Sequence, residues 1–290
     1  MYTTLISVPQ LQALQKSSAP LVVFDCSFEL SQPAAGDAQY AQCHIAGALR
    51  ADLDRHLSAH GSADAASGGR HPLPAREKFA AWIGAMGVQP GTQVVTYDRQ
   101  GMVYCGRLWW MLKWLGHDAV AVLDGGFQAW QDAAGQVQAG HATAPDPRKF
   151  HASNYPLAPT KYALVAADNV AKQLGQPQQT ILDARGAPRF RGEVEPLDPV
   201  AGHIPGALNR VYSDNLTPQG CFKSPAQLRR EFEALLAGRD SATVVHHCGS
   251  GVSAIPNLIA MEIAGFGPTT LYAGSWSDWC SDPRRPVAQG

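Results

Sequence analysis

The chain is built from two similar halves, and no other feature constrains its fold as strongly. The apolar run LVVFD ends at Asp25, and a comparable run, TILD, ends 158 residues later at Asp183. The motif HIAGA at residues 44–48 returns as HIPGA at residues 203–207, at an offset of 159. The two offsets agree within one residue, and they far exceed the period of roughly 20–50 residues found in solenoid proteins. A duplicated domain is therefore indicated.

A helical segment follows in each half. A proline precedes the helical pattern in LPAREKFAAWIGAMG (73–87), and another does so in SPAQLRREFEALLAG (224–238). In the second segment Ser224 is a residue type that caps helices, and Pro225 suits the first helical position. Short apolar runs alternate with such patterns along both halves, which is typical of parallel sheets covered by helices. We predict an α/β fold of two tandem domains, each a mainly parallel sheet flanked by helices.

The length of the chain and one proline-rich stretch set the predicted domain boundaries. The 290 residues suffice for two domains of roughly 100–150 residues each. Residues 141–160, HATAPDPRKFHASNYPLAPT, are rich in proline and small residues, which is typical of an extended linker. We predict a first domain at residues 1–142, a linker at 143–160 and a second domain at 161–290.

Charge and hydropathy exclude two classes of partner. The chain carries 23 Lys and Arg against 24 Asp and Glu, so it has no overall basic field that would attract nucleic acid. The start of the sequence lacks a basic segment followed by an apolar run, and no stretch reaches the roughly 20 apolar residues of a membrane span. We expect a cytoplasmic protein without nucleic-acid or membrane partners.

The six cysteines are expected to be reduced thiols, because they show neither CxxC spacing nor a secretory context. The run His246-His247-Cys248 lacks a second ligand pair at zinc-site spacing, so we expect no metal. If one of these cysteines is reactive, its immediate surroundings must make it so.

One loop differs between the halves in a way that changes its chemistry. The segment QVVTYDRQG (93–101) corresponds to TVVHHCGSG (243–251), so Asp98 in the first half stands where Cys248 stands in the second. Cys248 follows a predicted strand and precedes a helix expected from about Ala254. The first N–H groups and the dipole of that helix favour the thiolate form of a cysteine held there.

The residues after Cys248 support the same interpretation. Gly249 and Gly251 are expected to let the backbone curl, so that several N–H groups converge on a negative charge. The ordinary alternative is that Cys248 is a small buried residue at a strand end. We favour a nucleophile because a strand, a glycine loop and a helix start coincide.

These motifs resemble the two-domain rhodanese-like sulfurtransferases over nearly the whole chain. The resemblance rests on HIAGA, HIPGA, the loop Cys-Gly-Ser-Gly-Val-Ser at 248–253 and the segment GSWSDW at 274–279. The loop is most similar to that of 3-mercaptopyruvate sulfurtransferases, whereas thiosulfate enzymes commonly carry arginine and lysine after the cysteine. The family resemblance implies two rhodanese-like domains without a cofactor, the second catalytic and the first, with Asp98, catalytically silent.

The resemblance also implies a set of catalytic residues around Cys248. Ser250 matches the hydroxyl of the family loop, His71 in GGRHPLP resembles its histidine, and Asp52 resembles its aspartate. A histidine oriented by a carboxylate can act as a general acid and base. The ordinary alternatives are a surface-loop histidine and a structural turn aspartate.

Substrate binding is expected from the loop and from one arginine. Gly249, Gly251, Val252 and Ser253 are the predicted loop contacts. Arg189 matches the family arginine, and its planar guanidinium suits carboxylate oxygens. The alternative for Arg189 is a surface ion pair with Glu193 or Glu195.

The chain departs from the family at the position of a second arginine. The family commonly places an arginine after a Glu-Pro pair, but Leu197 follows Glu195-Pro196 here. Either one arginine and the loop N–H groups hold the donor, or Arg185 or Arg191 substitutes, or the preferred donor is a different sulfur compound.

Our first hypothesis for function is a double-displacement sulfurtransferase. Cys248 would take the outer sulfur from 3-mercaptopyruvate, release pyruvate and hand the sulfur to a thiol, to cyanide or to a thioredoxin-like protein. Thiosulfate is the alternative donor, and a persulfide carrier without turnover is the non-enzymatic alternative. A cysteine phosphatase is disfavoured because Ala254 stands where that chemistry needs an arginine.

Overall fold

The computed structural model describes residues 1–140, 154–160 and 162–290, and it divides into two compact units. The predicted linker at 143–160 therefore falls partly outside the described residues. Each unit contains a short segment from the other half of the sequence, so the segment that carries His71 belongs with Cys248. Unit 1 comprises Met1–Ala59, Pro74–Lys161 and Pro218–Cys221, and unit 2 comprises His60–Leu73, Tyr162–Thr217 and Phe222–Gly290.

Unit 1 contains a five-stranded sheet in the order β1-β6-β5-β2-β4, and every strand pair in it is parallel. A small antiparallel pair, β3 with β7, forms a separate two-stranded sheet. The strands of the large sheet are β1 (Leu5–Ile6), β2 (Leu21–Asp25), β4 (Leu49–Arg50), β5 (Gln93–Tyr97) and β6 (Val120–Leu123), and the small pair is β3 (His44–Ile45) with β7 (Val137–Gln138). The helices are α1 (Val8–Gln15), α2 (Ala35–Gln42), α3 (Arg76–Ala85), α4 (Val103–Leu115) and α5 (Gly126–Asp132).

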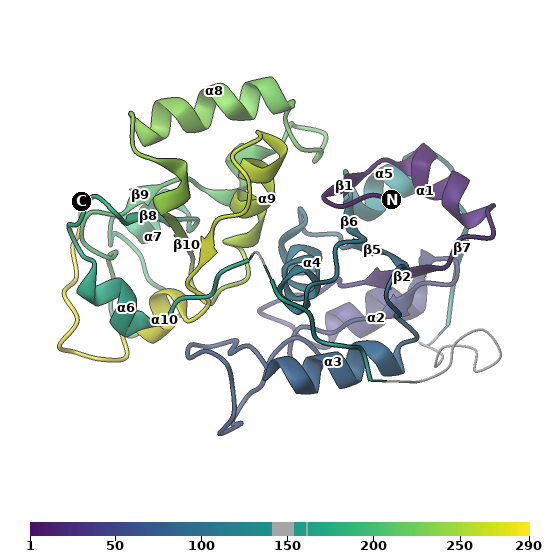
Figure 1. Ribbon diagram of the computed structural model, residues 1–290, viewed down its shortest axis with the longest axis horizontal. Coiled ribbons are helices and arrows are strands. Elements are labelled where there is room, and N and C mark those ends of the chain that lie inside the picture. Colours follow the sequence, from purple (N-terminus) through teal and green to yellow (C-terminus); the bar gives the residue numbers. More distant parts are fainter. Residues whose placement is uncertain (141–153, 161) are drawn as a thin grey trace. The chain divides into compact units, whose positions relative to one another are not determined.

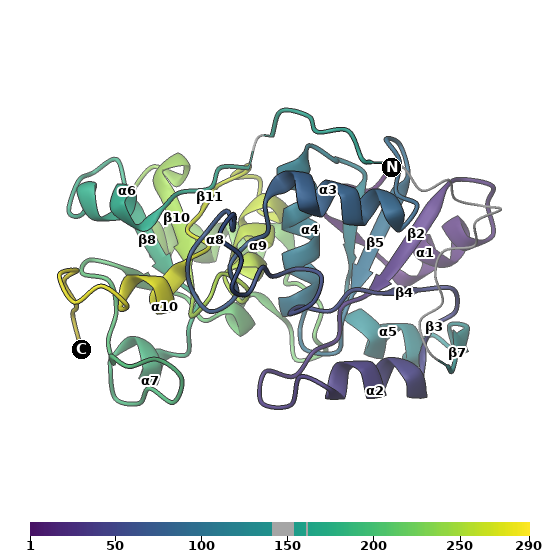
Figure 2. The ribbon, with the colours of Figure 1, turned by 90° about the horizontal axis from the view of Figure 1, so that it is seen from below.

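Helices cover both faces of this sheet, as alternating side chains on its strands require (Figure 2). Val23 of β2 belongs to a core cluster with Leu11 of α1 and Trp130 of α5. The next residue, Phe24, points to the opposite face, where its ring lies 5.8 Å from that of Trp82 on α3. Figure 2 accordingly shows α3 and α4 on one side of the strands and α5 on the other.

Unit 2 contains a four-stranded parallel sheet in the order β11-β10-β8-β9. Its strands are β8 (Thr180–Asp183), β9 (Leu208–Asn209), β10 (Val244–His247) and β11 (Thr270–Leu271). Its α-helices are α6 (Ala167–Lys172), α7 (Ala187–Phe190), α8 (Pro225–Leu236), α9 (Ile255–Ile263) and α10 (Ser275–Trp279), and the 3-10 helices are η1 (Tyr212–Asn215) and η2 (Ser241–Thr243).

Two layers of helices enclose the sheet of unit 2 (Figure 1). Trp276 and Trp279 of α10 pack with Val170 of α6 in one core cluster. Figure 1 shows α8 and α9 on the other side of β8 and β10. The α/β fold predicted from the repeat, with two mainly parallel sheets flanked by helices, is confirmed.

The predicted start of α8 is confirmed in atomic detail. The Ser224 hydroxyl accepts a hydrogen bond from the Gln227 N–H at 3.3 Å, and Pro225 occupies the first turn. Buried Leu228, Phe232 and Leu236 recur every four residues along the helix, so one face of α8 packs inward.

No helix in the described part of the chain is both long and apolar enough to span a membrane. The described residues also contain no cluster of three or more histidine, cysteine or acidic side chains suited to a metal ion.

Candidate active site

Cys248 lies directly after β10, where the chain leaves the sheet and turns toward α9. The expected start of this helix is confirmed, because α9 begins at Ile255 with Pro256 in its first turn. The Cys248 N–H donates to the Ser275 hydroxyl at 3.1 Å, and its carbonyl accepts from the Trp276 N–H at 2.9 Å. The residue is 1% exposed. Its backbone is thus fixed on both sides by the first residues of α10.

Gly251 is required by both conformation and space. Its φ is +73°, a left-handed conformation that glycine adopts without strain. A Cβ added at this position would lie 2.3 Å from the Ala273 carbonyl oxygen. Gly251 therefore allows the sharp bend predicted for the loop.

Gly249 differs from Gly251 in its conformation. It does not adopt a left-handed conformation, so its φ does not itself require glycine, and its part in the curl of the loop stays a prediction. A Cβ at Gly249 would lie 3.2 Å from Nη2 of Arg70 and 3.6 Å from Nη1 of Arg189. The absence of a side chain here leaves room for two guanidinium groups beside Cys248.

The corresponding loop of unit 1 shows what such a loop can bind. Asp98 stands in the position of Cys248, and its carboxylate accepts hydrogen bonds from the N–H groups of Gln100, Met102, Tyr104 and Cys105 at 2.8–3.0 Å. Burial raises the pKa of Asp98, and these four bonds oppose that rise. The loop of unit 1 is thus a ring of backbone donors around an acidic side chain.

Ser250 and His71 are brought together, although 179 residues separate them in sequence. The Ser250 Oγ and the His71 Nδ1 lie 2.7 Å apart, and both residues are buried. Both belong to unit 2. The hydroxyl and imidazole predicted from sequence are therefore in direct hydrogen-bond contact two residues from Cys248.

The segment that carries His71 is fastened to the start of α10. The Arg70 N–H donates to the Ser277 hydroxyl at 3.0 Å. Gly69 has a φ of +87°, and a Cβ there would lie 2.3 Å from the Gly274 carbonyl oxygen. Since α10 also fixes Cys248, one short helix positions the cysteine and the histidine together.

Asp52 belongs to unit 1, where its carboxylate organises a turn. It accepts the N–H groups of Asp54 and Arg55 at 3.0 Å each and pairs with Arg50 at 3.1 Å. This is the turn arrangement that the ordinary alternative anticipated. The catalytic role of Asp52 stays a prediction.

The two remaining predicted loop contacts lead from Cys248 into α9. Val252 is buried, and its carbonyl accepts from the Ile255 N–H at 3.1 Å. Ser253 follows and is partly exposed. These residues close the loop, and their contact with substrate stays a prediction.

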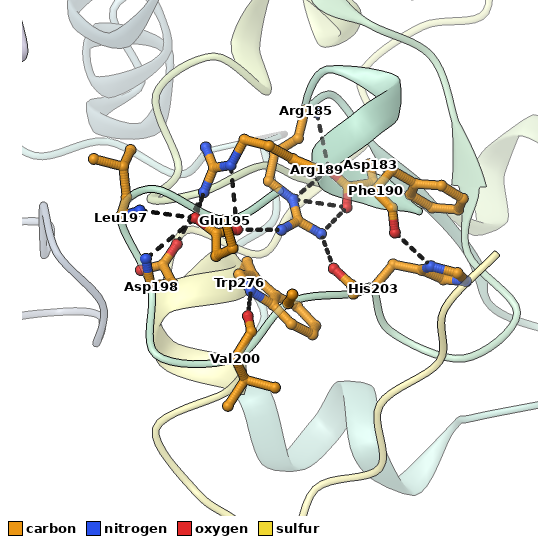
Figure 3. A network of polar contacts seen from close by, with 12 residues as sticks. Asp183, Arg185, Arg189, Phe190, Glu195, Leu197, Asp198, Val200, His203 and Trp276 are labelled. Atoms are coloured by element: carbon orange, nitrogen blue, oxygen red, sulfur yellow. Dashed lines mark hydrogen bonds and ion pairs between the residues drawn. The ribbon is translucent and has the colours of Figure 1, made fainter. Parts of the chain in front are cut away.

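Arg189 forms the ion pair that was its ordinary alternative, and its substrate-binding role stays a prediction. Its Nη2 lies 2.6 Å from Oε1 of Glu195 and 3.1 Å from Oδ2 of Asp198, so the expected ion pair with Glu195 is present (Figure 3). Its Nη1 is at the same time an atom that a Cβ on Gly249 would contact. The guanidinium is therefore held in place by carboxylates while it lies beside the loop.

Arg70 also lies at this loop, where it was not predicted from the sequence. Its Nη1 lies 2.6 Å from Oδ1 of Asp198, and its buried Nε has no hydrogen-bond partner among the described residues. Its position next to His71 was the available signal. Asp198 thus holds Arg70 and Arg189 on its two oxygens, which places both guanidinium groups at Gly249.

Neither arginine suggested as a substitute for the missing family arginine takes that place. Arg185 is buried, bonds Asp183 at 2.7 Å and Gly202 at 2.7 Å, and stacks over the Trp276 ring at 4.6 Å (Figure 3). Arg191 pairs with the exposed Glu193 at 2.7 Å. Both are engaged in structural contacts.

The charge on the strand-end residues follows from their burial. Burial lowers the pKa of His246 to about 3, so this ring is neutral at neutral pH. Burial also lowers the pKa of His247, and the neighbouring Asp183 opposes that shift. Burial would raise the pKa of Asp183, but His247, whose Nε2 lies 3.5 Å from Oδ2 of Asp183, and the charge and hydrogen bonds of Arg185 outweigh it, so the pKa is lowered. Asp183 is thus held between His247 and Arg185 at the end of β8.

Curated proteins include relatives that match almost the whole length of this chain. The chain is 46% identical over 287 residues to a probable 3-mercaptopyruvate sulfurtransferase from Pseudomonas aeruginosa, covering 99% of this chain and 98% of that protein. It is 37% identical over 289 residues to a putative thiosulfate sulfurtransferase from Mycobacterium tuberculosis, covering 99% and 97%.

Comparison with structures and family models agrees with these relatives. The solved structure of 3-mercaptopyruvate sulfurtransferase from Leishmania major has a TM-score of 0.81 and 31% identity, over 98% of this chain and 75% of that one. The model of the rhodanese-like domain matches residues 7–133 and again residues 166–282. The resemblance stated from the sequence is thereby confirmed, and the chain belongs to the two-domain rhodanese-like sulfurtransferases.

Proposed function

We propose that this protein moves a sulfane sulfur from 3-mercaptopyruvate to an acceptor through a persulfide on Cys248. The observation that carries the proposal is the group gathered in unit 2: Cys248, the Ser250–His71 hydrogen bond of 2.7 Å, and two guanidinium groups at Gly249. A relative that is 46% identical over nearly the whole chain is named a probable 3-mercaptopyruvate sulfurtransferase.

In the first half-reaction the Cys248 thiolate attacks the sulfur of the donor. A new S–S bond forms, the C–S bond of the donor breaks, and its electron pair leaves on carbon as the enolate of pyruvate. The donor's sulfur, with its proton, stays on Cys248 as a persulfide. The enolate then takes up a proton to give pyruvate.

Ser250 and His71 act on the leaving group. A hydroxyl that donates to the ketone oxygen stabilises the enolate as it forms, and an imidazole in contact with that hydroxyl can relay a proton. Asp52 is proposed to assist His71, as the family resemblance implies. This machinery suits a carbon leaving group, whereas the sulfite released from thiosulfate needs no such proton.

Arg70 and Arg189 are proposed to bind the donor's carboxylate. Guanidinium groups form short, directional hydrogen bonds with carboxylate oxygens. Because Asp198 holds both groups, their orientation is fixed before the donor arrives, which lowers the entropy cost of binding. The loop N–H groups of residues 249–253 are proposed to stabilise the persulfide, as the equivalent groups of unit 1 bind the Asp98 carboxylate.

In the second half-reaction a thiol, cyanide or a thioredoxin-like protein attacks the outer sulfur and restores the Cys248 thiolate. We place this reaction in the cytoplasm. All six cysteines are free, which fits a compartment that keeps thiols reduced.

Steady-state kinetics with both donors test the proposal. We expect turnover with 3-mercaptopyruvate and a small thiol, a lower efficiency with thiosulfate, and loss of both in Cys248→Ser. Cys221→Ser is the matched control, since Cys221 is a partly exposed free cysteine of unit 1. Single sulfur loading without turnover would instead support a carrier, and a clear preference for thiosulfate would support the alternative donor.

A further inference from the structure

One carboxylate occupies the centre of the donor site without belonging to the predicted machinery. Asp198 bonds Nη1 of Arg70 at 2.6 Å with one oxygen and Nη2 of Arg189 at 3.1 Å with the other. Its side chain is 3% exposed, and its N–H donates to Oε1 of Glu195 at 3.1 Å. Figure 3 shows Asp198 and Glu195 beside Arg189, and the Leu197 N–H donates to Oε1 of Glu195 at 3.1 Å.

The charges of this network cancel. Arg70, Arg185 and Arg189 face Asp183, Glu195 and Asp198 in a connected set of ion pairs, three cations against three anions. The two guanidinium groups that border Gly249 remain partly exposed, at 26% for Arg70 and 20% for Arg189. The site therefore offers directional N–H donors to an anion but little net positive charge.

Because the arginines of the network are matched by carboxylates, the site is expected to discriminate between donors of different charge. A carboxylate donor carries one negative charge and matches a guanidinium pair in shape. Thiosulfate carries two, so every buried carboxylate nearby repels it twice as strongly. Of the three acidic residues, Asp198 is the one that contacts both donor-binding arginines.

We propose that Asp198 is the residue that sets donor selectivity, because its charge makes the Arg70–Arg189 pair accept a monoanionic carboxylate donor in preference to a dianionic sulfur donor. The proposal rests on the proposed function, and it explains how a site with two arginines can discriminate against anions that carry two charges. It also gives Asp198 a role beyond holding two side chains in position.

The test is the ratio of kcat/KM for thiosulfate to kcat/KM for 3-mercaptopyruvate in Asp198→Asn. Asparagine keeps an oxygen that accepts from one arginine but removes the charge. Removing one negative charge several Å from the donor, in an effective dielectric of about 20, favours a dianion over a monoanion by about ten- to a hundredfold. We expect the ratio to rise by about tenfold or more.

Two variants separate charge from geometry. Asp198→Glu keeps the charge but moves the oxygens, so we expect the ratio to stay near that of the wild type. Glu193→Gln makes the same change of charge on the same loop, where Glu193 contacts exposed Arg191, and should also leave the ratio unchanged. An unchanged ratio in Asp198→Asn, or an equal rise in Asp198→Glu, overturns the proposal.

A second measurement does not depend on sulfur transfer. The rates of Cys248 alkylation by iodoacetate and by neutral iodoacetamide report the preference of the site for an anion, and Asp198→Asn should raise their ratio severalfold. If the wild type transfers sulfur from neither donor, the proposed function is wrong. The ratio of the two alkylation rates then tests by itself whether the charge of Asp198 disfavours anions at the site. A ratio that Asp198→Asn leaves unchanged overturns that effect as well.

Discussion

Replacing Arg70 by alanine tests the donor site most sharply, because no sequence motif identified this residue. Its guanidinium lies at Gly249, and its ion pair with Asp198 is largely buried. A hydrogen bond between a guanidinium and a carboxylate contributes about 1.5–3 kcal/mol. Loss of that contact corresponds to a decrease of about 10- to 150-fold in kcat/KM for 3-mercaptopyruvate.

The decrease should appear mainly in KM, because the carboxylate is bound equally before and during sulfur transfer. Steady-state kinetics with 3-mercaptopyruvate and a fixed thiol measure it. Arg70→Lys keeps the charge but loses the planar fork, so we expect an intermediate effect. Arg191→Ala removes an exposed arginine of the same unit and serves as the control.

Thermal unfolding of each variant checks that unit 2 is intact. If Arg70→Ala stays within twofold of the wild type in KM and in kcat/KM while it folds normally, the assignment of Arg70 to the donor site is wrong. A lower kcat at constant KM would likewise contradict carboxylate binding, since it would place the effect on the sulfur-transfer step.

Three further predictions address the catalytic pair, the loop and the buried histidine. Ser250→Ala should lower kcat with 3-mercaptopyruvate by about 100-fold or more and leave the thiosulfate reaction much less affected, because only the enolate needs a proton; equal losses with both donors would contradict this role. Gly251→Ala should lower the free energy of unfolding by at least about 2 kcal/mol in a denaturant titration, because the left-handed φ of Gly251 disfavours a side chain and an added Cβ would lie 2.3 Å from the Ala273 carbonyl oxygen. A decrease below about 0.5 kcal/mol would show that the loop rearranges to accept the methyl group. Burial lowers the pKa of His246 to about 3, so below pH 6.5 the unfolded state binds a proton that the folded state does not, and the free energy of unfolding should fall as the pH drops from about 6.5 toward 3, by up to about 1.4 kcal/mol per pH unit. The melting temperature of His246→Leu should therefore fall less steeply over this pH range than that of the wild type. Parallel curves of melting temperature against pH for the two proteins would refute this assignment.

The fold could be predicted because its evidence is local and occurs twice. Buried strands such as β2 and β8 are short apolar runs, and helix α8 begins at a serine and a proline with known preferences. The offset between the halves then placed Asp98 opposite Cys248. The strand end, the glycines and the helix start around Cys248 predicted a loop that binds negative charge, and the corresponding loop of unit 1 binds the Asp98 carboxylate with four N–H donors.

The donor site could be predicted only in part, because its arginines are oriented by contacts that are distant in sequence. Asp198 lies 128 residues from Arg70 in sequence, and no local sequence pattern predicts that one carboxylate pairs with two guanidinium groups. The same contact adds a constraint at Gly249 that the sequence did not indicate. The guanidinium groups of Arg70 and Arg189 lie beside it, so the position has little room for a side chain.

The intact mass of the protein after incubation with 3-mercaptopyruvate alone, followed by peptide mapping, shows whether Cys248 carries a persulfide. We expect a gain of one sulfur atom, located on the peptide that contains Cys248, absent in Cys248→Ser and removed by a thiol. An unchanged mass, or a sulfur that persists in Cys248→Ser, would contradict it.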